Sequence, residues 1–225
     1  MMRAMKTFLR WLAPLVLLGV CAPALAQIYQ VQPLPLQWYL EAGPSFTTGT
    51  TSNFLTNGWT IGTGFTARPD PSGPFAIRTD FQYSRFNATN QLLSEGAQAN
   101  QTQIDGGNGQ VFSADVDGVL QFPVSPGMRL YVMAGGGLAH RYVQLTQNVV
   151  SGGLPCGGWF SFCGPYTAGQ SVVASDSQTH LSWNAGAGMD FALPGGQSWF
   201  VEARYEEIQT AQPTQFIPIR IGLRF

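Results

Sequence analysis

The chain has 225 residues and a formal net charge of −1, and only 10% of its residues are charged. Soluble domains average about a quarter charged residues, so this composition is unusual for one. Without a basic excess to contact phosphates, the sequence argues against nucleic-acid binding. After residue 26, no apolar run reaches the roughly 18 residues that a membrane-spanning helix needs.

The first 26 residues predict a secretory signal peptide. Basic residues at its start precede an apolar run over 11–20, and Ala24-Leu25-Ala26 offers a cleavage site of small residues. We expect cleavage after Ala26 and export of the remaining chain. Residues 27–36 would then form a short N-terminal periplasmic segment before the first predicted strand.

Alternation of apolar and polar residues recurs along residues 37–225, whereas no helical period of useful length is visible. The predicted strands are 37–46, 58–67, 75–86, 111–122, 129–142, 179–192, 198–206 and 216–225. Their lengths are near or above the roughly nine to eleven residues that cross a bilayer when tilted. The pattern predicts an all-β fold: a transmembrane, antiparallel, up-and-down β-barrel of eight strands.

The connections between the predicted strands alternate in length. The short turns, rich in Pro and Gly, are 68–74, 123–128 and 193–197, and the longer polar loops are 47–57, 87–110, 143–178 and 207–215. Barrels of the bacterial outer membrane sort their connections in this way, with turns at the periplasm and loops outside. We therefore expect the cell outer membrane as the location, with outer-membrane lipid and lipopolysaccharide around the barrel wall.

Most of the predicted strands have one apolar, aromatic-rich face and an opposite face on which the charged residues lie, whereas the strand 129–142 is apolar on both faces around Met133 to Leu138. We assign the apolar face to lipid and the charged face to the interior, which eight strands leave just wide enough for side chains. Near mid-height we predict an interior charge cluster of paired carboxylates and arginines. Its members are Glu41, Arg78, Asp80, Asp117, Glu202, Arg204 and Arg220. We interpret it as a polar plug, and a gated ion path is the alternative.

Cys156 and Cys163 lie in the predicted loop 143–178, beside several glycines. In an oxidising compartment such a pair predicts a disulfide. A metal site is the rival interpretation, but the two histidines of the chain lie elsewhere in the sequence. Gly186-Ala187-Gly188 lies within a predicted strand, so it is not a dinucleotide-binding fingerprint. We expect neither a metal nor a cofactor.

His180 and Ser182 are two residues apart on a predicted strand, so both side chains point the same way. The pair resembles a motif of the outer-membrane lipid A deacylases, in which a serine and a histidine act on lipid. Here the neighbours Leu181 and Trp183 belong to the lipid-facing set, which places His180 and Ser182 toward the interior. We predict no catalytic residue and no enzyme activity, with a lipid A-modifying barrel enzyme as a rival hypothesis.

Four segments together resemble the OmpA-like superfamily of outer-membrane β-barrels, the small eight-stranded surface proteins that include opacity-type and porin-like barrels. They are Trp38–Gly43, Trp183–Phe191, Phe200–Tyr205 and Ile217–Phe225. The resemblance implies a non-enzymatic barrel with a structural, surface-exposed or adhesion role, and a small passive channel is the alternative. It also implies that the barrel assembly machinery reads Phe225 as an assembly signal. An extracellular ligand would then bind at the loops.

Overall fold

The computed structural model describes residues 36–70, 72–151 and 167–225. The predicted signal peptide, all but the last residue of the segment 27–36, and the cysteine pair Cys156 and Cys163 lie outside the described residues.

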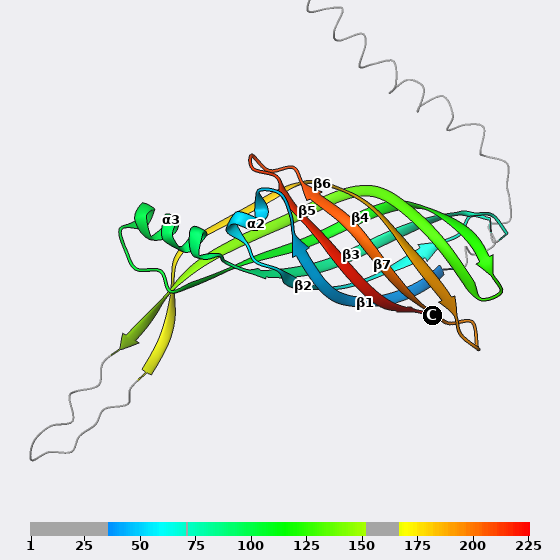
Figure 1. The fold of residues 1–225 in the computed structure, drawn as a ribbon, viewed down its shortest axis with the longest axis horizontal. Coiled ribbons are helices and arrows are strands. Elements are labelled where there is room, and N and C mark those ends of the chain that lie inside the picture. Colours follow the sequence, from blue (N-terminus) through cyan, green and yellow to red (C-terminus); the bar gives the residue numbers. More distant parts are fainter. Residues whose placement is uncertain (1–35, 71, 152–166) are drawn as a thin grey trace, which may run out of the picture. The chain divides into compact units, whose positions relative to one another are not determined.

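Antiparallel strands form a closed barrel in chain order, in which β1 also pairs with β8 (Figure 1). The strands are β1 (Leu36–Thr47), β2 (Gly58–Ala67), β3 (Phe75–Asn87), β4 (Gly106–Ser125), β5 (Met128–Ser151), β6 (Thr167–Ala192), β7 (Ser198–Ile208) and β8 (Thr214–Arg224). The predicted eight-stranded, all-β barrel is confirmed.

Three strands are longer than predicted. β4 begins at Gly106, β5 continues to Ser151 and β6 begins at Thr167, whereas the other five agree with their predicted ranges to within two residues. β5 and β6 pair along their whole length, but β7 joins β6 only from Ser182 onward. The added residues do not alternate regularly between apolar and polar: in β5, the consecutive residues Leu145 and Thr146 are both buried, and Leu145 packs against Gly96 of α3. Figure 1 shows the extension leading away from the rest of the barrel.

Two helices lie in connections for which we expected no helical structure: α2 (Thr51–Phe54) and α3 (Asn90–Asn100). α3 begins at a capping residue, because the Thr89 hydroxyl accepts a hydrogen bond from Leu92 N at 3.3 Å. A Cβ at Gly96 would touch the Leu145 side chain, so α3 packs closely on β5. Tertiary packing therefore stabilises a helix whose own sequence pattern is weak. No helix among the described residues is long and apolar enough to span a membrane.

Short turns join the strands at one end of the barrel, which we call the short-turn end; the opposite end is the long-loop end. In the β2–β3 turn, the Ser72 hydroxyl and backbone N–H donate to Asp70 Oδ1 at 2.7 and 2.9 Å. The Ser72 hydroxyl, followed by the backbone N–H, holds the pKa of Asp70 below its usual value. In the β6–β7 turn, Gly195 and Gly196 have φ angles of +94° and +86°, which favour glycine.

The wall of the barrel reverses the usual burial pattern of a soluble protein. Ile219, Ile221 and Leu223 of β8 are exposed on the outside, whereas Arg220 and Arg224 at alternate positions of the same strand are buried inside. The outward face also carries aromatic side chains near both ends. At the short-turn end they include Trp38, Phe191 and Trp199, and at the long-loop end Trp59, Tyr83 and Phe112. An apolar band between two aromatic girdles is typical of a transmembrane barrel.

Candidate functional site

The structure brings the seven predicted cluster residues together inside the barrel. Each lies at an inward position of β1, β3, β4, β7 or β8, because every second residue of a pleated strand faces the same side. Arg78 of β3 is at the centre of many contacts. Its guanidinium nitrogens lie 2.8 Å from Glu41 Oε2, 2.6 Å from Glu202 Oε2 and 2.9 Å from Asp80 Oδ1.

Arg204 of β7 contacts two of the carboxylates that bind Arg78, those of Asp80 and Glu202, and also contacts Asp117. Its Nη2 lies 3.0 Å from Asp80 Oδ2 and 2.9 Å from Glu202 Oε1, and its Nη1 lies 3.2 Å from Asp117 Oδ2. Asp80 therefore bridges the guanidinium groups of Arg78 and Arg204, and Glu202 bridges the same two. The contacts form a connected network rather than a set of separate pairs.

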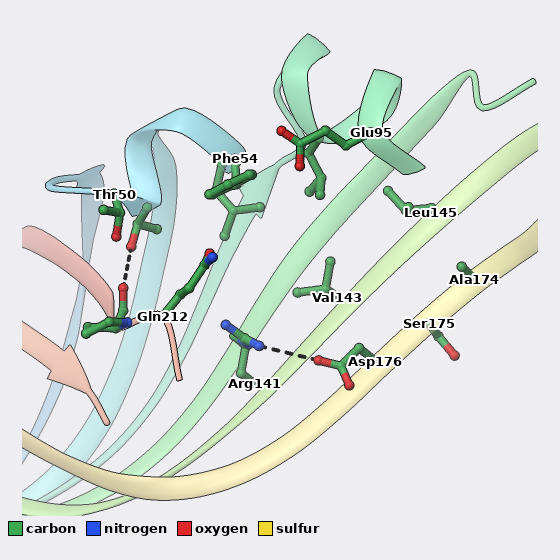
Figure 2. Close-up of a pocket in the computed structure, with 14 residues that line it drawn as sticks. Thr50, Phe54, Glu95, Arg141, Val143, Leu145, Ala174, Ser175, Asp176 and Gln212 are labelled. Carbon is green, nitrogen blue, oxygen red and sulfur yellow. Dashed lines mark hydrogen bonds and ion pairs between the residues drawn. The ribbon is translucent and has the colours of Figure 1, made fainter. Parts of the chain in front are cut away.

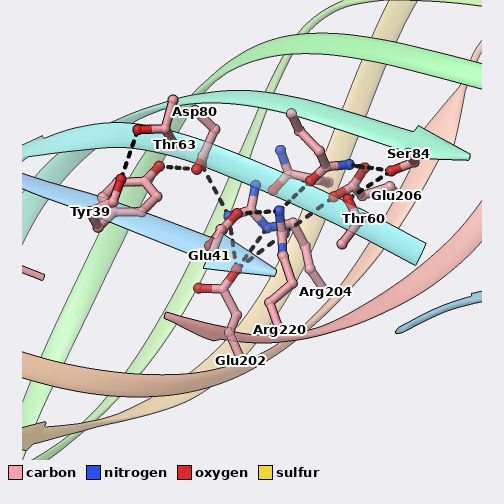
Figure 3. Close-up of polar contacts among 12 residues, drawn as sticks. Tyr39, Glu41, Thr60, Thr63, Asp80, Ser84, Glu202, Arg204, Glu206 and Arg220 are labelled. Atoms are coloured by element: carbon pink, nitrogen blue, oxygen red, sulfur yellow. Dashed lines mark hydrogen bonds and ion pairs between the residues drawn. The ribbon is translucent and has the colours of Figure 1, made fainter. Parts of the chain in front are cut away.

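Arg220 of β8 extends the network toward the long-loop end (Figure 3). Its Nη1 lies 2.6 Å from Glu41 Oε1, and its Nη2 lies 3.2 Å from Glu202 Oε1 and 3.3 Å from Glu206 Oε1. The side chain of Arg220 is 0% exposed, and that of Arg78 is 1% exposed. Charges so deeply buried persist only when they are paired and hydrogen-bonded, a condition that this network meets.

Aromatic rings enclose the guanidinium of Arg78. Its Cζ lies 4.2 Å from the centroid of the Tyr39 ring and 5.5 Å from that of Phe200, which adds cation–π attraction. Arg78 Nε donates to the Tyr39 hydroxyl at 3.0 Å, and this hydroxyl in turn donates to Asp80. The rings therefore restrict the guanidinium to one position against its carboxylate partners.

Sequence reasoning missed several polar members of the interior. The five are Tyr39, Gln82, Tyr131, Asn184 and Glu206. Glu206 and Gln82 share the inward face with Arg204 and Asp80, so the alternation could have found them. Tyr39 and Tyr131 gave a misleading signal, because aromatic residues in a barrel are first assigned to lipid.

Apolar groups enclose the interior cluster along the barrel axis. On the long-loop side they are Leu55, Phe86, Val111, Ala139, Ile208 and Phe216. On the short-turn side they are Ala76, Val119, Tyr131 and Met133. Phe86 and Phe216 pack edge to face with ring centroids 5.3 Å apart, and each is 1% exposed. Side chains with so little exposure do not border a water-filled passage.

Inward glycines make room for large side chains. A Cβ at Gly64 would collide with Tyr39, one at Gly188 with Tyr131 and one at Gly222 with Phe200. At these three glycine positions the side chain of any other residue would collide with a ring that lines the cluster.

A second group of charges lies nearer the short-turn end. Arg224 Nη1 is 2.5 Å and Arg129 Nη2 3.3 Å from Asp190 Oδ2. The Arg224 guanidinium carbon also lies 4.9 Å from the centroid of the Phe200 ring. Phe200 thus contacts arginines of both charged groups.

His180 and Ser182 have separate partners. Ser182 Oγ donates to Asp115 Oδ1 at 2.9 Å, and His180 Nε2 lies 3.0 Å from Gln178 Oε1. In a serine–histidine pair the serine hydroxyl donates to the imidazole, whereas this hydroxyl donates to a carboxylate of β4 instead. Among the described residues, no group of three or more His, Cys, Asp or Glu side chains could hold a metal ion.

Apolar outside and charged inside, this closed ring of strands is a transmembrane β-barrel of eight strands. The model of the outer membrane protein β-barrel domain family matches residues 12–225, and the chain belongs to this family. The protein therefore lies in the outer membrane, as its sequence predicted, with membrane lipid around its wall. No curated protein sequence matches the chain.

Solved structures with a similar fold include both surface proteins and an enzyme. Neisserial surface protein A is 12% identical, with a TM-score of 0.50 over 84% of this chain and 95% of that chain. Ail, the attachment invasion locus protein of Yersinia pestis, is 16% identical, with a TM-score of 0.47 over 84% and 97% of the two chains. The outer membrane enzyme PagL is 17% identical, with a TM-score of 0.42 over 84% and 98%. Such low identities show the fold alone.

Proposed function

We propose that this protein is a non-enzymatic outer-membrane barrel with a closed interior, which acts at the cell surface as a structural or adhesion protein. The observation that carries the proposal is the buried charge cluster enclosed by apolar groups on both sides. Arg78, Arg204 and Arg220, each paired with several carboxylates inside the barrel, brace its walls and leave its outer end available for contacts.

The closed interior is the argument against the second candidate function, a small passive channel. An ion crossing the barrel would have to separate Arg220 from Glu41 and then pass between Phe86 and Phe216. Removing one partner of a buried ion pair costs several kcal/mol, roughly 3–5 by mutational measurements. A barrier of this kind supports a plug rather than a conducting path.

Conductance in planar bilayers tests the closed interior. We expect no steady openings from the purified protein, in bilayers where a reconstituted general porin conducts under the same conditions. A matched variant, Phe86→Ala with Phe216→Ala and Arg220→Ala, removes one apolar layer and one guanidinium, and should show frequent openings. Steady openings of the unmodified protein would establish the channel instead.

The long-loop end would face the outside of the cell, since outer-membrane barrels have short periplasmic turns and longer outer loops. The extension of β5 and β6 then stands at the surface, with a β6 edge that is free of β7 before Ser182. Unpaired strand edges offer backbone groups to a binding partner. An extracellular ligand would bind at this edge. We also propose that the barrel assembly machinery recognises Phe225 when it inserts the barrel into the outer membrane.

Cysteine labelling tests this orientation. In a background with Cys156→Ser and Cys163→Ser, Ser171→Cys on the extension should react with a membrane-impermeant maleimide in intact cells. Ser125→Cys at the short-turn end is the matched control, and should react only after the cells are lysed. The reverse pattern would invert the orientation.

Cell attachment tests the adhesion role separately. Cells that produce the protein should attach to a host-cell monolayer more than cells that produce a barrel without residues 147–171. Equal attachment, with equal amounts of both barrels at the surface, would leave a structural role only.

A further inference from the structure

A cavity of about 400 Å³ lies at the long-loop end, separate from the interior cluster (Figure 2). Side chains from α2, α3, β5 and β6 and from the connection between β7 and β8 line it. Its apolar members are Phe54, Leu55, Leu92, Val143, Leu145, Ala174 and Pro213. This size and this mostly apolar lining suit a small organic ligand, for which cavities of roughly 300–1,000 Å³ are usual.

The cavity is closed toward the interior of the barrel. Leu55 lines the cavity and also belongs to the apolar group around Phe86 and Phe216, and Leu92 packs against that group. A molecule entering from the long-loop side would therefore reach a layer of apolar side chains at the bottom of the cavity. The cavity is a blind pocket and not the mouth of a channel.

Charged groups on two walls determine which ligand fits. On the β5–β6 wall, Arg141 and Asp176 point toward each other with Nη2 3.3 Å from Oδ2, and Arg141 Nη1 donates to Thr214 at 3.0 Å (Figure 2). On the α3 wall, Glu95 is exposed and accepts a hydrogen bond from Gln91 Nε2 at 3.0 Å.

The balance of these charges favours a cation. Arg141 is 19% exposed and already has a carboxylate partner, whereas Asp176 is 53% exposed and keeps oxygen surface available. Glu95 adds a second accessible carboxylate, so two acids face one paired guanidinium. A positively charged group in the cavity would meet attraction from the carboxylates on both walls, since Glu95 and Asp176 both line it.

We propose that this cavity binds a small amphipathic cation: an amine with an aromatic or aliphatic body about the size of an indole. The body would contact Phe54, Val143 and Leu145, and the ammonium would lie toward Glu95 and Asp176. This inference is independent of the proposed function, because a ligand in a blind cavity requires neither conductance nor cell attachment.

Three probes with one ring system and different charges test the proposal. They are tryptamine, which is a cation, the uncharged 3-ethylindole and the anion indole-3-propionate. Binding is measured by calorimetry on the purified barrel in phosphatidylcholine nanodiscs, with empty nanodiscs as the blank. We expect saturable binding of tryptamine, and binding of the other two probes that is about tenfold weaker or more. Equal binding of all three, or preference for the anion, would overturn the proposal.

Variants then locate the site. Val143→Phe fills the cavity and should abolish tryptamine binding. Glu95→Gln with Asp176→Asn should weaken it about tenfold while leaving 3-ethylindole unchanged. Asp176→Asn alone frees Arg141 and should strengthen binding of indole-3-propionate. Glu207→Gln changes a carboxylate at the same end of the barrel but outside the cavity, and should have no effect.

Heat-modifiable gel migration shows that each variant is folded. If Val143→Phe does not fold, tryptamine binding by the charge variants still tests whether the cavity is the binding site. Unchanged tryptamine binding in Glu95→Gln with Asp176→Asn, or in a folded Val143→Phe barrel, would refute binding at this cavity.

Discussion

Arg78 Nη1 and Glu202 Oε2 lie 2.6 Å apart, although 124 residues separate them along the chain. Their strands are not neighbours, since β3 pairs with β2 and β4, and β7 pairs with β6 and β8. The ion pair therefore crosses the interior, and Arg204 with Asp80 makes a second crossing between the same strands. These contacts hold opposite walls together in a way that the hydrogen bonds between neighbouring strands cannot.

Arg78→Met should destabilise the barrel by about 3–5 kcal/mol, because Glu41, Asp80 and Glu202 would stay buried with one cation fewer. Urea unfolding in lipid vesicles, followed by gel migration, measures the change. Arg85→Met is the matched control on the same strand, where the side chain is exposed on the outer face, and it should change stability by less than about 0.5 kcal/mol. Equal effects of the two substitutions would contradict a bracing role.

Gly64→Ala should cost about 1–3 kcal/mol, because a Cβ there would collide with the Thr79 carbonyl oxygen and the Tyr39 hydroxyl. Displacing Tyr39 would also disturb its contact with Arg78. Gly169→Ala in β6 is the control, since nothing lies within 4 Å of the added Cβ. The same urea experiment compares the Gly64→Ala and Gly169→Ala variants. Similar midpoints of unfolding would mean that the Tyr39 ring moves aside without loss of stability.

Ser182→Ala should leave the lipid A of producing cells unchanged. The Ser182 hydroxyl donates to Asp115 inside the barrel, where a lipid in the surrounding bilayer does not reach it. Mass spectra of lipid A from cells with the original protein, the variant and no protein make the comparison. Deacylated lipid A that is present with the original protein but absent with both Ser182→Ala and no protein would instead identify a lipid A-modifying enzyme.

Asp70 should titrate below its ordinary pKa of 3.8, because Ser72 donates two hydrogen bonds to its ionised carboxylate. As the pKa is lower in the folded turn, the stabilisation is present above pH 3.8 and is lost as the pH falls through the folded value. Carboxyl-carbon NMR of Asp70 measures this, and Ser72→Ala should raise the pKa toward 3.8. An unchanged titration in Ser72→Ala would show that Ser72 is not the cause.

Alternation along single strands was enough to predict the wall and to place seven charged residues on the inward face, although it missed Glu206 and the uncharged polar members. Arg220 and Arg224 occupy every second position of β8 between exposed apolar residues, and closing the barrel sends all such positions to one interior. The partners within that interior were not predictable. Whether Arg78 meets Glu202 or Asp117 depends on the stagger of the strands around the ring, which no single strand encodes.

Features beyond the apolar band escaped prediction for a different reason. Residues 143–149 of β5 show no regular alternation, because Leu145 and Thr146 are both buried at an irregularity in the pairing with β6. α3 depends on Gly96 fitting against Leu145, a contact between segments distant in sequence. The cavity needs α2, α3, β5 and β6 together, and its charged groups Glu95 and Asp176 look like ordinary loop residues in the sequence.

Trp38 and Phe225 exchange backbone hydrogen bonds of 3.0 and 2.9 Å, which join the first strand to the last. Strand order in this protein is therefore cyclic, and each strand keeps the same two neighbours wherever the chain is cut. A circularly permuted chain, with Phe225 linked to Leu36 and new ends at Gly195 and Gly196, would form the same barrel with the same register between every pair of strands. The order in which the strands are exported would change, and Phe225 would no longer be the chain end, so the permutation separates the demands of the sheet from those of biogenesis.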